Sequence, residues 1–303
     1  MTWGPKRIIA LILCLFALPL AAGCSATNER PVSASTGPHA GPALWKVADK
    51  DTTIYLFGTI HFLPDNVEWY ADDISAALQS SGELVTEFDA SEANRLVDLM
   101  QKTAFLPESE NLRDKLSRED RLAFEKLLVT LGIPIERYDR YRPWAAGLEM
   151  SVLMIRLAGF DPGEGVEKVV LEKAPAGIKL SALETIDYQM GIFSKLPDHA
   201  QLAYFNQVIG ASSQLGPTLD HMLELWLDGD AAMLARLMNS SQTDPLLYKR
   251  LLTDRNDNWA RWIGNRLKEP GTVFVAVGAG HLAGKGSVQD RLKKMGIRAR
   301  RVR

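Results

Sequence analysis

The sequence predicts an α/β fold with a central, mostly parallel or mixed sheet. Three observations support this: strand-like apolar segments gather at the two ends of the body, a G-x-x-H turn follows a strand at each end, and the long middle has helical periodicity. We therefore expect two strand–GxxH–helix–strand halves separated by a helical insertion over about residues 91–268. We expect them to form one domain over residues 43–303, with two independent domains as the alternative.

The front half is predicted to begin with a β-hairpin, because residues 44–47 and 53–57 flank a short polar turn. A helix is expected over residues 71–81, since its apolar residues share one face and Gly82 ends it. A further short strand is expected over residues 83–88. Strand, helix and strand in this order form a βαβ unit, whose two strands run parallel.

The middle of the chain is predicted to be helical. One helix is expected to begin after the capping residue Ser117 and to end at Gly132, and another to run from Pro143 to Gly159. A strand over residues 178–184 interrupts the helices. Further helices are expected near residues 165–174, 186–195, 198–214, 218–228, 230–239 and 255–268.

The back half is predicted to repeat the order of the front half. Residues 272–277 form a near-continuous apolar run, which is typical of a strand covered on both faces. A glycine-rich turn, a helix near residues 288–295 and a last strand over 297–302 are expected to follow.

The N-terminus has the pattern of a secretory signal peptide over residues 1–23. Two basic residues precede an apolar run over 8–20, and small residues occupy 21–23. The run of thirteen residues reaches only about 20 Å as a helix, whereas the hydrocarbon core of a bilayer is ~30 Å thick. We therefore expect this segment to be removed and not to remain as a membrane span.

Cys24 is predicted to be lipidated, because residues 21–24 resemble a bacterial lipobox in which Ala21 stands where leucine is usual. It would be the single cysteine of the mature chain, and residues 24–42 would form a flexible tether behind it. Several acyl chains give stable membrane attachment. Ser25 in the next position resembles the sorting rule for the outer membrane, so we expect a lipid anchor in the bacterial cell envelope that faces the periplasm. Plain secretion with a leftover thiol is the alternative.

The composition is that of an ordinary globular protein, with 46% hydrophobic and 24% charged residues. These fractions exclude disordered, collagen-like and coiled-coil chains. With 35 basic and 37 acidic residues, the net charge of −2 offers no field that would attract nucleic acid, and no such partner is expected.

The two G-x-x-H turns are the clearest candidates for a functional site. Gly58 and Gly278 let the backbone turn sharply at the carboxyl end of a strand, which is where α/β sheets bind ligands. His61 and His281 should therefore reach the same edge, and Glu87 lies at the end of another strand. Two histidines and a carboxylate form a common catalytic metal set. The alternative is that each histidine is merely hydrogen-bonded.

A second interpretation concerns residues 277–284, which resemble a dinucleotide-binding fingerprint with three arginines nearby over 298–301. Three points argue against it. The bulky His281 stands where the backbone must approach a pyrophosphate, only about twenty residues remain after the turn, and an exported protein meets little NADPH. The basic C-terminal residues are better explained as a charged edge strand.

The chain resembles the TraB/GumN family, which is related to the TIKI metalloproteases and more distantly to erythromycin esterase and ChaN-like proteins. The resemblance covers about residues 43–303 and depends on the paired G-x-x-H motifs among the other matching stretches. These are residues 44–47, 56–61, 84–87, 142–144, 183–185 with Gln189, 255–256 with Trp259, and 277–282.

The resemblance implies a metal-dependent, peptidase-like hydrolase that acts on a peptide or small amide. The TIKI branch favours Mn²⁺ or Co²⁺, and a His/His/carboxylate set also suits Zn²⁺ or Fe²⁺. By resemblance, His61 and His281 are metal ligands, Glu87 is a ligand or general base, and Arg255 stabilises an oxyanion. Arg255 has an equally strong alternative, which is to cap a helix and pair with charged neighbours.

Two further hypotheses remain open. A non-catalytic protein could bind or sequester a peptide signal or haem in the same crevice, since TraB-like proteins are linked to a peptide pheromone and ChaN-like proteins to haem. Alternatively, the histidines could hold the two half-sheets of an envelope scaffold together.

Overall fold

The computed structural model describes residues 41–161, 165–240 and 244–303. The predicted signal peptide, the predicted lipidation site Cys24 and nearly all of the predicted tether lie outside these residues. Within the described segments, no helix combines the length and the apolar character needed to cross a bilayer.

The strands of the described residues form one mixed sheet in the order β4-β3-β5-β2-β1-β6. β1 pairs antiparallel with β2 and β6, whereas β2–β5, β5–β3 and β3–β4 are parallel pairs. The prediction of an α/β fold with a mostly parallel or mixed sheet is confirmed, and so is the N-terminal hairpin. The strands are β1 (Leu44–Ala48), β2 (Thr52–Thr59), β3 (Glu83–Thr86), β4 (Lys179–Ala182), β5 (Gly271–Gly278) and β6 (Arg300–Arg301).

The central strand β5 lies between β2 and β3 and is covered on both faces, as its apolar run predicts. Val273, Val275 and Val277 belong to one hydrophobic cluster, whereas Phe274 and Ala276 belong to another. Because side chains alternate along a strand, these two clusters lie on opposite faces of the sheet.

Helices cover both faces of the sheet. On the face of the three valines, α12 (Asp254–Arg266) and α13 (Val288–Lys294) pack through side chains such as Ile263 and Leu292. On the other face, α2 (Asp72–Gln79) contributes Ile74 and Leu78 to the larger cluster. The resulting arrangement of three layers is that of many α/β proteins.

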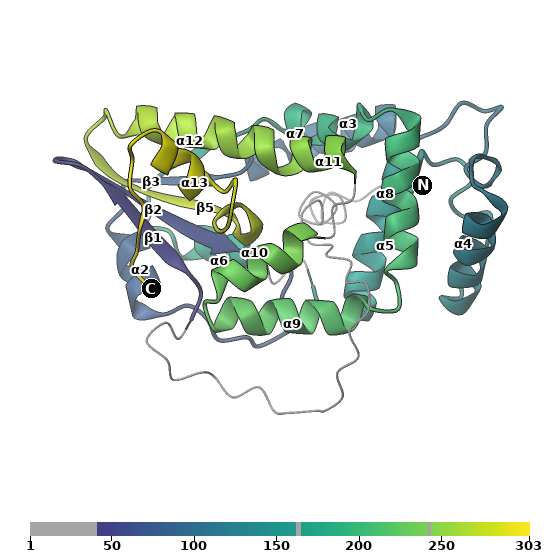
Figure 1. Ribbon diagram of the computed structural model, residues 1–303, viewed down its shortest axis with the longest axis horizontal. Helices are drawn as coiled ribbons and strands as arrows, with labels where there is room; N and C mark the ends of the chain where they lie inside the picture. Colours follow the sequence, from purple (N-terminus) through teal and green to yellow (C-terminus); the bar gives the residue numbers. More distant parts are fainter. Residues whose placement is uncertain (1–40, 162–164, 241–243) are drawn as a thin grey trace.

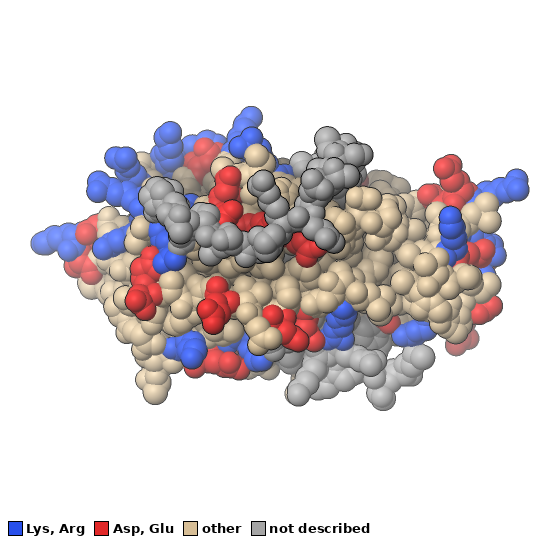
Figure 2. All heavy atoms as spheres, turned by 90° about the horizontal axis from the view of Figure 1, so that it is seen from below, with Lys and Arg blue, Asp and Glu red and all other residues tan. Residues whose placement is uncertain are grey.

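The predicted insertion consists mainly of helices and extends away from the sheet, with α4 at the far end of the molecule in Figure 1. Ser117 caps α4 by accepting a hydrogen bond from the amide of Asp120, and Pro143 occupies the first turn of α5. The helices are α3 (Ala93–Thr103), α4 (Arg118–Thr130), α5 (Pro143–Leu157), α6 (Val166–Lys173), α7 (Ile186–Ser194), α8 (Asp198–Gly210), α9 (Leu215–Leu227), α10 (Ala231–Ser240) and α11 (Pro245–Tyr248). Figure 2 shows acidic and basic side chains interspersed along one face of the molecule.

The structure differs from the sequence predictions in four elements. Helices α3 and α11 were not expected, and a π-helical turn, Lys249–Thr253, joins α11 to α12. The last strand, expected over residues 297–302, is reduced to β6, because only two of its residues pair with β1 at the edge of the sheet.

Candidate functional site

The two G-x-x-H turns begin at adjacent strand ends. The parallel register of β2 and β5 pairs Thr59 with Gly278, so the chain leaves both strands at the same level. A Cβ on Gly58 would lie 3.2 Å from the Cα of Ala279, which explains the need for glycine where the turns approach each other. The indole of Trp226 donates a hydrogen bond to the carbonyl oxygen of Gly58 over 2.8 Å and fixes the first turn.

The three predicted metal ligands surround one point above Gly278. A Cβ placed on this glycine would lie 3.2 Å from Oε1 of Glu87, 3.6 Å from Cδ2 of His281 and 3.7 Å from Nε2 of His61. All three side chains are buried, with exposed fractions of 4%, 1% and 4% respectively. The topology therefore brings together residues that are far apart in the sequence, at the carboxyl ends of β2, β3 and β5.

His61 is oriented by a carboxylate that the sequence analysis did not single out. Its Nδ1 lies 2.6 Å from Oε1 of Glu167, in the first turn of α6. Burial lowers the pKa of His61, but the charge of Glu167 and its hydrogen bond outweigh burial, and the pKa is raised above its usual value. Burial raises the pKa of Glu167 in turn, and the interaction with His61 reverses this, so its pKa is lowered.

His281 is held in one tautomer by Asn256. The amide nitrogen of Asn256 donates to the carbonyl oxygen of Gly286 over 2.9 Å, which directs its oxygen to Nδ1 of His281 at 2.6 Å. Burial, Arg255 and then His61 lower the pKa of His281 well below its usual value, so the imidazole is neutral. Nδ1 therefore carries the proton, and Nε2 presents a lone pair to Nη1 of Arg255 at 3.0 Å.

Glu87 joins the two histidine turns to Arg255. Its Oε1 accepts a hydrogen bond from the amide of Gly278 over 2.8 Å, and its Oε2 accepts one from Nη2 of Arg255 over 2.6 Å. The amide of Gln189 lies 3.4 Å from the same Oε2. The position of both carboxylate oxygens is thus fixed from two sides.

Arg255 is fully buried and pairs with two carboxylates. Its Nε donates to Glu184 over 2.8 Å, and its guanidinium lies 4.5 Å from the centre of the Trp259 ring, whose indole also donates to Glu184. Burial lowers its pKa, but Glu87 and Glu184 outweigh burial and raise it. The structure thus pairs Arg255 with two carboxylates that are distant in the sequence, and a role in stabilising an oxyanion stays a prediction.

The backbone before Arg255 also belongs to the site. The carbonyl oxygen of Leu251, in the π-helical turn, accepts a hydrogen bond from Nη1 of Arg255 over 3.3 Å. Turns of this kind occur frequently at functional sites. No apolar periodicity in the sequence distinguishes such a turn from an ordinary helix.

The side chains at the site are of types that bind a divalent cation, because two imidazoles and a carboxylate converge above Gly278. Nδ1 of each imidazole also faces a partner, Glu167 for His61 and Asn256 for His281, as is typical of metal-binding histidines. The guanidinium of Arg255, however, lies between Glu87 and His281. In the part of the chain that the structure describes, no group of three or more histidine, cysteine, aspartate or glutamate side chains is arranged at metal-binding distances.

Of the residues that orient the histidines, Asn256 and Glu167 were not assigned a role from the sequence. Asn256 lies in one of the stretches that carry the family resemblance, and this was the one signal in the sequence that could have pointed to it. Glu167 had no such signal, because an acidic residue in the first turn of a helix is common for reasons of the helix dipole alone.

The model of the TraB/PrgY/gumN family matches residues 43–301. An uncharacterized protein of Treponema pallidum (strain Nichols) is 22% identical over 305 residues, which cover 95% of this chain and 91% of that protein. The uncharacterized protein YbaP of Escherichia coli (strain K12) is 24% identical over 245 residues, which cover 79% of this chain and 87% of YbaP. No solved structure matches the chain.

Proposed function

Because the chain belongs to the TraB/PrgY/gumN family, we propose that it is a metal-dependent hydrolase of the peptidase type, with a peptide or small amide as substrate. The observation that carries the proposal is the orientation of the two imidazoles. Nδ1 of His61 faces Glu167 and Nδ1 of His281 faces Asn256, whereas Nε2 of His281 accepts a hydrogen bond from Nη1 of Arg255. Metal-binding histidines typically have their second nitrogen held by such partners.

His61, His281 and Glu87 would hold the metal, with Mn²⁺ or Co²⁺ favoured and Zn²⁺ or Fe²⁺ compatible. For His281 to take part, Nη1 of Arg255 has to leave Nε2, which it approaches to 3.0 Å. A bound divalent ion lowers the pKa of a water molecule and polarises a carbonyl group.

The remaining chemistry comes from side chains of this chain. As the alternative to binding the metal, Glu87 would act as the general base that accepts a proton from an attacking water; Gly278 and Arg255 hold its two oxygens in place. The guanidinium of Arg255 would supply positive charge to a tetrahedral oxyanion. Burial excludes bulk water from all of these groups and strengthens their electrostatic interactions.

We further propose that the protein is attached to the bacterial envelope through a lipid on Cys24, in the outer membrane and facing the periplasm. The pattern of residues 1–24 supports this proposal. Mass spectrometry of the protein from membranes would test it. A diacylglyceryl-modified N-terminal Cys24 is expected, and an unmodified thiol or an uncleaved leader would contradict it.

The hydrolase is tested by incubating the full chain, loaded with Mn²⁺, with a library of blocked peptides. We expect cleavage that is lost in His61→Ala and in Glu87→Gln and retained in His221→Ala, whose side chain is exposed on α9. Binding of intact peptide without cleavage, or a Soret band after addition of haem, would instead indicate the non-catalytic binding protein.

A further inference from the structure

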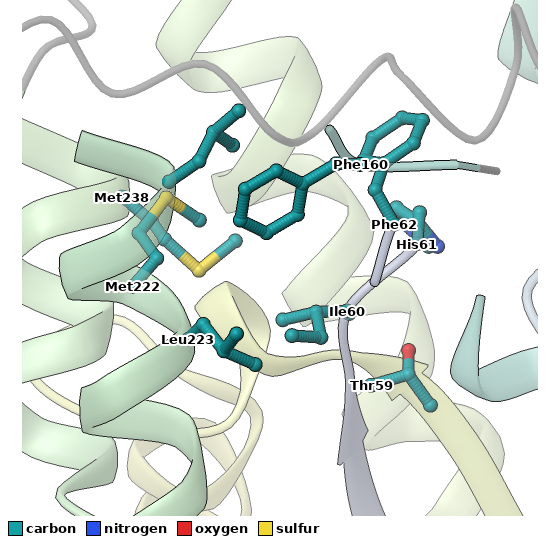
Figure 3. Close-up of a pocket in the computed structure, with 10 residues that line it drawn as sticks. Thr59, Ile60, His61, Phe62, Phe160, Met222, Leu223 and Met238 are labelled. Atoms are coloured by element: carbon teal, nitrogen blue, oxygen red, sulfur yellow. The ribbon is translucent and has the colours of Figure 1, made fainter. Parts of the chain in front are cut away.

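A small apolar pocket opens beside the candidate site. It shares His61 and Gly278 with the site, and its other walls come from the end of β2 and the turn after it, from α9 and α10, and from the segment after α5. In Figure 3, Met222, Met238 and Phe160 point toward one another across this space, and His61 lies at its edge.

The pocket has almost no polar lining. Met222, Met238 and Phe160 are buried, with exposed fractions of 4%, 8% and 3%, and Leu223 completes this wall. His61 is the one titratable side chain among the residues that line the pocket. Moving a charged group into such surroundings is strongly unfavourable unless a partner compensates its charge, so the pocket disfavours charged side chains.

The size of the pocket is that of a small group. Its volume of about 20 Å³ exceeds the ~10–15 Å³ that holds a single water molecule. Methionine side chains are unbranched and change conformation readily, so Met222 and Met238 can adapt to an occupant without a change in the backbone.

The wall of the pocket is attached to the turn that carries His281. The amide of Asn239, next to Met238 on α10, donates to the carbonyl oxygen of Gly280 over 3.0 Å. A Cβ on Gly280 would lie 3.4 Å from Cε of Met238. The pocket wall formed by α10 is therefore fixed to the turn of His281, and His61 itself lines the pocket, so an occupant would lie close to both histidines.

We propose that this pocket is the specificity pocket of the site and takes a small aliphatic side chain next to the bond that is cleaved. The inference rests on the proposed hydrolase function and adds the class of substrate: a peptide or amide with an uncharged, apolar residue at this position. Met222 and Leu223 set the depth of the pocket and are its specificity-determining residues.

The test compares peptides of the form acetyl-Gly-Gly-Xaa-Gly-Gly-amide with the full chain loaded with Mn²⁺, where Xaa is Ala, Val, Leu, Phe, Asp or Lys. We expect kcat/KM for Ala and Val to exceed that for Asp and Lys by about 100-fold or more. Met222→Ala should shift the ratio toward Leu and Phe by about tenfold, and Leu223→Phe should shift it toward Ala. Met100→Ala, a truncation at a buried methionine of α3 that does not line the pocket, is the matched control and should keep the wild-type order.

A second measurement separates the pocket from the chemistry. In protein labelled with ¹³C at the methionine methyl groups, acetyl-valinamide should shift the Met222 and Met238 signals, whereas acetyl-aspartamide should not. Cleavage with no dependence on Xaa, or with the same order in Met222→Ala, overturns the pocket and leaves the hydrolase intact. Methyl shifts without cleavage of any peptide support the pocket as a binding site and reject the hydrolase. Neither cleavage nor shifts would reject both.

Discussion

Replacing Arg255 by alanine removes the cation that pairs two buried carboxylates. Arg255 is fully buried, and it donates to Glu87 over 2.6 Å and to Glu184 over 2.8 Å. Removing one partner of a buried ion pair costs about 3–5 kcal/mol, because the remaining charge is left uncompensated. For a domain of this size, each kcal/mol corresponds to roughly 2–4 °C, so Tm should fall by about 6–20 °C.

The cause of this loss can be tested separately, because Arg255→Ala leaves Glu87 and Glu184 buried without their cation. The combination of Arg255→Ala with Glu87→Gln and Glu184→Gln should recover part of the lost stability at neutral pH.

The assay is thermal unfolding followed by circular dichroism. The matched control is Arg95→Ala, which breaks a two-point contact with Asp187 whose side chains are about half exposed, and this variant should unfold close to the wild type. If Arg255→Ala lowers Tm no more than Arg95→Ala does, the reasoning about the buried network is refuted.

Three further predictions concern the site and the helical region. Gly278→Ala should lower the rate of hydrolysis by about tenfold or more, because the added Cβ would lie 3.2 Å from Oε1 of Glu87. The φ of Gly278 is −51°, which suits alanine, so Tm should change little. Full activity of this variant would contradict the proposal. Asn256→Leu should raise the Kd for Mn²⁺ by about 10–100-fold, as measured by calorimetry, because Nδ1 of His281 loses the oxygen of Asn256 as its partner. An unchanged Kd would argue against metal binding by this histidine. Asp139→Asn removes the negative charge and one of the two oxygens that accept hydrogen bonds from Arg113 at 2.6 Å, and these hydrogen bonds are the main reason that the pKa of Asp139 is lowered. The Tm difference from the wild type should be largest at neutral pH and close as the pH falls through the pKa of Asp139, whereas a constant difference would show that the pair does not contribute through its charge.

Much of the sheet could be predicted because its signals are local. The polar turn between β1 and β2 predicts the hairpin, and the uninterrupted apolar run of β5 predicts a strand covered on both faces. The length of β6 could not be predicted, because it depends on how many residues an edge strand pairs with β1. The short helix α11 and the π-helical turn after it interrupt the helical periodicity, and packing in three dimensions decides such details.

The convergence of His61, His281 and Glu87 could be predicted for a geometric reason. Each of them follows or ends a strand, and the carboxyl ends of parallel strands meet at one edge. The partners of the histidines could not be predicted, since Glu167 reaches the site from α6 and Asn256 from α12 only after the helices have packed on the sheet. The sequence left both oxyanion stabilisation and charge pairing open for Arg255, because its partners too are set only when the helices pack on the sheet.

The measurement that tests the central claim most directly is the Mn²⁺ stoichiometry of the purified full chain, determined by calorimetry and elemental analysis. The account predicts about one ion per chain, with binding lost in His61→Ala and in His281→Ala and kept in His221→Ala. A wild-type protein that binds no ion, or histidine variants that bind as much as the wild type, would contradict it.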